Sequence, residues 1–159
     1  MHEPFATIYD GMDADPAEGE IAAAEELARL TGHMRLVSGA AEGITHAVAL
    51  CHGVAKRAGW WSDLATGEPK DRNDGELIAL MHSELSEALE GLRKSRNDDH
   101  LPHRRQVEVE LADTLIRIFD YAGARGLDLS GALVEKLAYN QSRSDHKIEN
   151  RAQADGKKF

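Results

Sequence analysis

The segment 107–119, VEVELADTLIRIF, is apolar on nearly every side of a helix, yet it contains two carboxylates, Glu110 and Asp113. A helix that is apolar nearly all round is expected to be buried. An isolated buried carboxylate is costly, and two buried carboxylates close together also repel each other. The segment therefore predicts a buried helix whose acids need a compensating partner.

The segment 81–94, MHSELSEALEGLRK, has the same peculiarity. Its expected inward stripe passes through Met81 and Ala88, and Glu84 lies on the line between them, with Glu87 one turn further on. Each acid pair alone is typical of a solvated helix face, but two pairs within apolar patterns on neighbouring helices indicate a shared ligand. Magnesium, with manganese as a substitute, favours such oxygen ligands. The predicted metal ligands are Glu84, Glu87, Glu110 and Asp113, whereas Glu90 and Glu108 are expected to face solvent.

Amphipathic periodicity and end signals predict about five helices, at residues 15–32, 40–58, 74–94, 105–124 and 128–143. Asp15 is the expected N-cap of the first helix, Pro16 its first helical residue and Gly32 its end. Gly126 is expected to end the fourth. Short loops between such helices favour an all-α antiparallel bundle. We expect an acidic N-terminal arm with one helix at 1–35, a catalytic helical domain at 36–146 and a polar tail at 147–159.

Charge and composition exclude several classes of partner. The net charge of -9 argues against nucleic acid, which needs a basic footprint, but not against a nucleotide bound through a metal ion. The single cysteine, Cys51, cannot form an intrachain disulfide and fits a reducing cytoplasm. No apolar run approaches the ~20 residues of a membrane span, and the first residues lack the pattern of a signal peptide. We expect a cytoplasmic protein without nucleic-acid or membrane partners.

The two acid segments together resemble the MazG-like family of all-α nucleotide pyrophosphohydrolases. The family pattern is E-x-x-E, a spacer and E-x-x-D, and here it is met by the four predicted ligands. The resemblance covers about residues 40–145. It implies Mg²⁺-dependent hydrolysis of a nucleoside triphosphate to monophosphate and pyrophosphate by a homodimer or homotetramer. It does not indicate which base or sugar is preferred.

Polar side chains elsewhere are candidates for binding the substrate. The last predicted helix carries Lys136, Asn140 and Arg143 along one side. The resemblance to the MazG-like family implies that such groups contact phosphates. Lys136 and Arg143 could equally extend from a helix edge into solvent. Trp61 could stack on a base with Arg72 and Asn73 nearby, an arrangement similar to that of related proteins. Core packing of Trp61 and capping by Asn73 are the alternative and the more common outcome.

The sequence thus predicts an Mg²⁺-dependent enzyme that cleaves a (d)NTP to (d)NMP and pyrophosphate. A water activated at the metal would attack phosphorus, and Glu87 is the candidate for orienting or deprotonating it. A phosphoribosyl-ATP pyrophosphohydrolase-like enzyme shares the acid pattern and stays open. So do a helical module that binds nucleotide without cleaving it and a helical interaction protein whose acids only form ion pairs.

Overall fold

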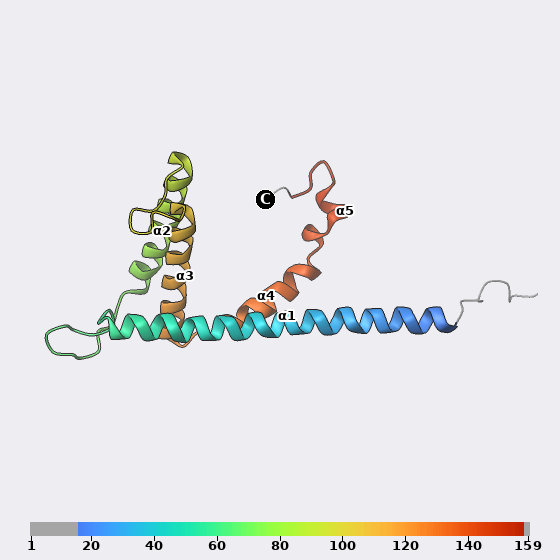
Figure 1. The fold of residues 1–159 in the computed structure, drawn as a ribbon, viewed down its shortest axis with the longest axis horizontal. Helices are drawn as coiled ribbons and strands as arrows, with labels where there is room; N and C mark the ends of the chain where they lie inside the picture. The colour runs from blue at the N-terminus through green and yellow to red at the C-terminus, as the bar shows by residue number, and fades with distance from the viewer. Residues whose placement is uncertain (1–15, 158–159) are drawn as a thin grey trace, which may run out of the picture. The chain divides into compact units, whose positions relative to one another are not determined.

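The computed structural model describes residues 16–157, and all regular secondary structure in this range is helical (Figure 1). These residues contain no strand, only isolated bridges between Ser62 and Pro69 and between Asn97 and Arg105. The all-α prediction is confirmed. The helices are α1 (Pro16–Arg57), α2 (Asp74–Lys94), α3 (Gln106–Arg125), α4 (Leu129–Ser142), the short 3₁₀ helix η1 (Ser144–His146) and α5 (Ile148–Arg151).

The first two predicted helices are one continuous helix, α1, so the expected end at Gly32 is wrong. No proline follows Pro16 before the helix ends, and a glycine inside a helix costs only ~1 kcal/mol, which its neighbours can offset. Pro16 opens the helix as predicted, whereas the expected N-cap Asp15 lies outside the described residues. The chain divides into two compact units between Gly39 and Ala40, and the candidate site lies wholly in the second.

Helix ends in the second unit follow the sequence signals. The Asn73 side-chain oxygen accepts a hydrogen bond of 3.0 Å from the backbone N–H of Glu76, which caps α2. Gly126 ends α3 in the left-handed conformation, at φ 62°, as predicted. The Asp128 carboxylate accepts from the backbone N–H of Gly131 and caps α4. These local contacts fix where the site-bearing helices α2 and α3 begin and end.

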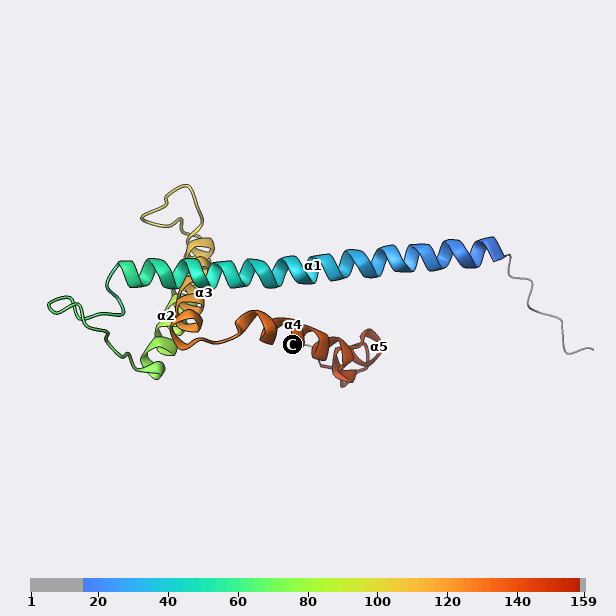
Figure 2. The same ribbon diagram turned by 90° about the horizontal axis from the view of Figure 1, so that it is seen from below.

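Helices α2 and α3 pack side by side as an antiparallel hairpin, visible from both directions in Figure 1 and Figure 2. At one end, a β-carbon on Gly91 would lie 2.9 Å from the Gln106 β-carbon, so Gly91 permits the close approach. At the other end, Arg125 Nε donates to Asp74 Oδ1 over 2.7 Å. Three of the buried residues between these ends are polar: Glu84, Glu110 and Thr114.

Burial of α3 on all sides, expected from its composition, is not found within the described part of the chain. It packs on α2 through one stripe and leaves other apolar side chains half-exposed, because few further helices of the second unit cover the hairpin. The exposed apolar residues of the hairpin include Ile78, Leu85, Leu89, Leu92, Leu111, Leu115 and Ile116. Among the described residues, no helix is both long and apolar enough to cross a membrane.

Candidate metal centre

Three carboxylates meet between the facing helices of the hairpin. Glu84 and Glu87 extend from α2 and Glu110 from α3, and one ligand oxygen from each lies within 4.8 Å of the others. Glu84 and Glu110 are buried, with 6% and 7% of their surface exposed, whereas Glu87 is exposed. We call these three residues the acid cluster. A single cation placed among them could contact all three, with its Glu87 side open to solvent.

The environment of Glu110 disfavours its charged form. Burial is the largest cause that raises the pKa of its carboxyl group above the ordinary value of 4.5. Gln106 Nε2 donates to Glu110 Oε1 over 3.3 Å and acts in the opposite direction. The charge of Glu87, and the hydrogen bond and charge of Glu84, raise the pKa further. Burial and the neighbouring acids therefore both favour the protonated form of Glu110.

Asp113 lies beside the acid cluster but is not one of its three members. Its pKa is raised above the ordinary 3.8, first by burial and then by the charge of Glu84. Arg117 opposes this shift, and Asp98 in the α2–α3 loop adds to it. The structure thus brings three of the four predicted ligands together and places Asp113 within their electrostatic reach. Its direct role as a ligand stays a prediction.

Arg117 is a functional candidate that the sequence reasoning missed. Its Nε and Nη2 atoms lie 2.6 and 2.5 Å from the same oxygen, Oε1 of Glu84. The spacing offered a signal, because Arg117 follows Asp113 by four residues and Glu110 by seven and so shares their face of α3. The guanidinium partly compensates the negative charge of the acids.

Asp120, one turn beyond Arg117, contacts both a histidine and a tryptophan side chain. Its Oδ1 lies 2.8 Å from His52 Nδ1 of α1 and accepts from Trp61 Nε1, also over 2.8 Å. The guanidinium groups of Arg72 and Arg125 lie 5.6 and 5.8 Å from the Trp61 ring centroid. Trp61 is therefore fixed in position by a carboxylate at its edge and by cations over its ring.

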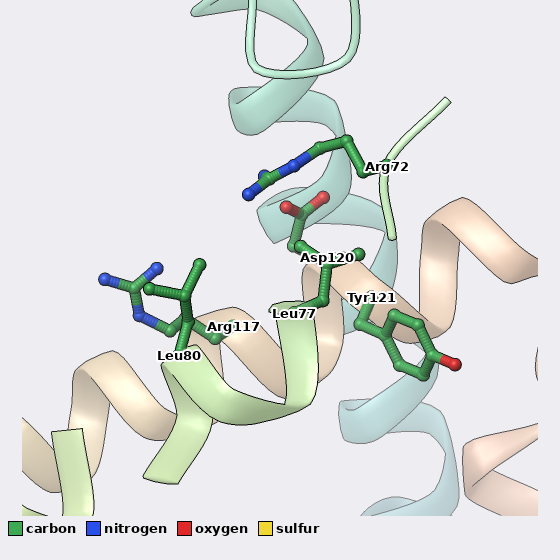
Figure 3. A pocket seen from close by; sticks show the side chains of 6 residues that line it. All are labelled: Arg72, Leu77, Leu80, Arg117, Asp120 and Tyr121. Carbon is green, nitrogen blue, oxygen red and sulfur yellow. The ribbon is translucent and has the colours of Figure 1, made fainter. Parts of the chain in front are cut away.

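Two pockets adjoin the contact between Asp120 and Trp61. The first, shown in Figure 3, lies between α2 and α3 beside the segment that precedes α2, and it is lined by Arg72, Leu77, Leu80, Arg117, Asp120 and Tyr121. The second, which we call the indole pocket, has Trp61, His52, Lys56, Lys70 and Arg125 in its lining. Of the three predicted base-binding residues, Trp61 and Arg72 each line a pocket. Asn73 caps α2, which was the alternative interpretation of that residue.

The predicted phosphate-binding residues lie on α4 and at its C-terminal cap, and two of them have other partners. Lys136 Nζ lies 4.7 Å from the Tyr139 ring centroid. Arg143 donates to Asp145 over 2.8 and 2.6 Å, which lowers the pKa of that carboxyl to about 2. Asn140 Oδ1 is buried and accepts no hydrogen bond within the described part of the chain. No hydrogen bond or ion pair in this part joins these three residues to the acid cluster, so their phosphate role stays a prediction.

Comparison of the chain with protein-family models, with curated proteins and with solved structures gives no match. The resemblance to MazG-like enzymes therefore rests on the acid pattern itself. What the chain does has to be inferred from the chemistry of the acid cluster and its neighbours.

Proposed function

We propose that this protein is a magnesium-dependent nucleoside triphosphate pyrophosphohydrolase of the MazG-like type, which converts a (d)NTP to (d)NMP and pyrophosphate. The observation that carries the proposal is the acid cluster, in which two buried carboxylates and one exposed carboxylate lie within reach of one cation. The donors suit Mg²⁺ or Mn²⁺, which take carboxylate oxygens and commonly complete their coordination with substrate phosphates and water.

The order of side chains along α3 supports a nucleotide as the substrate. Glu110, Asp113, Arg117 and Asp120 follow one face of the helix at intervals of three, four and three residues. Ten residues of helix span about 15 Å, a length comparable to an extended nucleotide. The acids lie at one end of this face, and Asp120 with Trp61 lies at the other. A triphosphate would lie toward the acids and a base toward the indole.

The chain's own residues would share the chemical work. Glu84 and Glu110 would hold the cation, and exposed Glu87 would orient a water and accept its proton. Bound Mg²⁺ supplies charge neutralisation and lowers the pKa of an attached water. The water oxygen forms a bond to the α-phosphorus while the bond from this phosphorus to the bridging oxygen breaks. Pyrophosphate then leaves with that oxygen and its electron pair.

Lysine and arginine side chains outside the acid cluster would assist in binding the nucleotide. Lys136 of α4 and Arg143, which caps its C-terminal end, are candidates supported by the sequence resemblance. Arg143 would have to leave Asp145 to reach phosphate. Lys56 and Lys70 line the indole pocket and form no ion pair with the other described residues, so they would add positive charge at the base end of the site. These cations would offset the repulsion between a triphosphate and a chain of net charge -9.

A homodimer or homotetramer is part of the proposal. The half-exposed leucines of α2 at positions 85, 89 and 92 recur at helical spacing, so they form an apolar stripe on the hairpin. A second copy of the same hairpin offers an equal stripe, and symmetric pairing would bury both.

The proposal is tested by offering the purified protein each common (d)NTP, and phosphoribosyl-ATP, with Mg²⁺ and measuring pyrophosphate release. Glu87→Gln should abolish turnover, because it removes the proton acceptor at little cost in shape. Glu108→Gln is the matched control, since Glu108 is exposed on α3 outside the acid cluster and should leave turnover unchanged. Release from phosphoribosyl-ATP alone would reassign the substrate. No release from any nucleotide would favour a binding module.

A further inference from the structure

We infer that Arg117 is an exchangeable counter-ion, which holds Glu84 in the metal-free protein and turns to the substrate's phosphates when a cation takes Glu84. This inference rests on the proposed function, because it concerns the same acid cluster. It assigns to Arg117 a role in binding that neither the acid pattern nor the residues of α4 supply.

The contact geometry makes Arg117 and a metal ion competitors. A carboxylate oxygen has two lone pairs, and Arg117 Nε and Nη2 both point to the single oxygen Oε1 of Glu84. A cation approaching that oxygen would meet a positive guanidinium 2.5 to 2.6 Å from it. Oε1 of Glu84 can therefore bind a metal ion only when Arg117 moves aside.

The charge balance explains why a guanidinium occupies this place. Within residues 16–157, no other ion pair involves a member of the acid cluster or Asp113. Arg117 is thus the counter-ion of a group whose buried members would otherwise repel one another. A divalent cation at the acid cluster would take over that role and leave Arg117 without its partner.

An Arg117 side chain released from Glu84 would have a pocket to enter and N–H donors for hydrogen bonds. Arg117 is 41% exposed at its side chain and lines the pocket in Figure 3, together with Arg72. A guanidinium carries five N–H donors, of which the contact with Glu84 uses two. Planar, paired donors suit phosphate oxygens. Arg117 would therefore donate hydrogen bonds, from the side of this pocket, to a phosphate held at the metal.

The test compares Arg117→Ala with the wild type in two calorimetric titrations, one with Mn²⁺ alone and one with inorganic tripolyphosphate at saturating Mn²⁺. We expect Mn²⁺ alone to bind the variant at least about fivefold more tightly, because its competitor is gone. We expect tripolyphosphate to bind at least about fivefold more weakly, because its phosphate ligand is gone. A purely structural role would weaken both affinities, so the opposite signs are specific to the exchange.

Two further variants make the result decisive. Arg93→Ala removes the same charge from an exposed position on α2 and should change neither affinity. Arg117→Lys keeps the charge but loses the paired donors, and it should shift both affinities in the same directions as alanine by less, which serves if alanine does not fold. Wild-type Mn²⁺ binding without opposite shifts would overturn the role of Arg117 alone. No Mn²⁺ binding by the wild type would overturn the proposed metal centre as well.

Discussion

Gly123 of α3 passes so close to His52 of α1 that a β-carbon at position 123 would lie 2.5 Å from the His52 β-carbon. The missing side chain lets the two helices approach until His52 reaches Asp120, which in turn holds Trp61. The position of the indole therefore depends on a glycine two elements away. This helix contact links the packing of α1 to the pocket proposed to receive a base.

Gly123→Ala should destabilise the protein by about 1–3 kcal/mol, because the added carbon forces α1 and α3 apart. Trp61 fluorescence should change as well, since its carboxylate partner moves. Gly43→Ala is the control: this exposed glycine of α1 has nothing within 4 Å of an added β-carbon and should gain about 0.5–1 kcal/mol from better helix propensity. Chemical unfolding monitored by circular dichroism measures both. Equal stability of the two variants would contradict the close contact.

The metal-free protein should lose stability as the pH rises through the folded-state pKa values of Glu110 and Asp113. Both pKa values are raised above the ordinary 4.5 and 3.8, so the folded state binds more protons than the unfolded state in this window. The free energy of unfolding therefore falls as the pH rises across the window between the unfolded-state and folded-state pKa values. Asp145 acts with the opposite sign, but only as the pH falls toward its pKa of about 2.

Unfolding measured from about pH 4 to pH 8 with a chelator, and again with saturating Mg²⁺, checks this dependence. Glu110→Gln should flatten the metal-free curve, and Mg²⁺ should do the same in the wild type. Glu108→Gln should leave the curve unchanged, because that side chain faces solvent. Stability that rises with pH across this range without metal would mean that the acids are already compensated.

Trp61 should report nucleotide binding through its fluorescence. Trp60→Phe removes the other tryptophan, which is 64% exposed, and should retain both binding and quenching. Trp61→Leu should weaken nucleotide binding by about 1–3 kcal/mol, the usual contribution of stacking on a base. Titration with a non-hydrolysable nucleotide measures both effects. Equal affinity of Trp61→Leu and wild type would remove the indole from the site and restore core packing as its role.

The wild type should have a mass in solution of two or four times 17.4 kDa. Leu89→Glu should shift the protein toward the monomer, because it places a charge in the apolar stripe of α2, where Leu89 is 58% exposed. Leu64→Glu is the control, since Leu64 is 86% exposed in the loop before α2. Light scattering across micromolar concentrations measures these masses. A wild-type monomer at all concentrations would contradict the pairing.

The sequence predicted the parts of this structure that depend on local chemistry. Asn73 and Gly126 mark helix ends because their side-chain and backbone preferences act within a few residues. The acid cluster was predicted because a carboxylate in an apolar stripe conflicts with burial wherever the helix packs. Gly32 was misread because a glycine weakens a helix without ending it, and the outcome depends on all its neighbours.

Contacts between distant segments were the part that the sequence did not predict. The sequence reasoning did not single out Arg117, and only the packing of α3 on α2 shows its contact with Glu84. His52 and Asp120 are separated by 68 residues, and their contact depends on the passage of α1 over Gly123. The exposed apolar face of α3 shows why composition alone misjudged its burial. Composition predicts that a helix is buried, but it does not predict whether the same chain or another chain buries it.

The acid cluster is proposed to support hydrolysis between the α- and β-phosphates of a nucleotide. This reaction is tested most directly by phosphorus NMR of the products formed from the best nucleotide in ¹⁸O-labelled water with Mg²⁺. Attack at the α-phosphorus predicts nucleoside monophosphate carrying the label and unlabelled pyrophosphate, with no product from Glu87→Gln. Labelled orthophosphate with nucleoside diphosphate would show attack at the terminal phosphorus and contradict the proposed reaction.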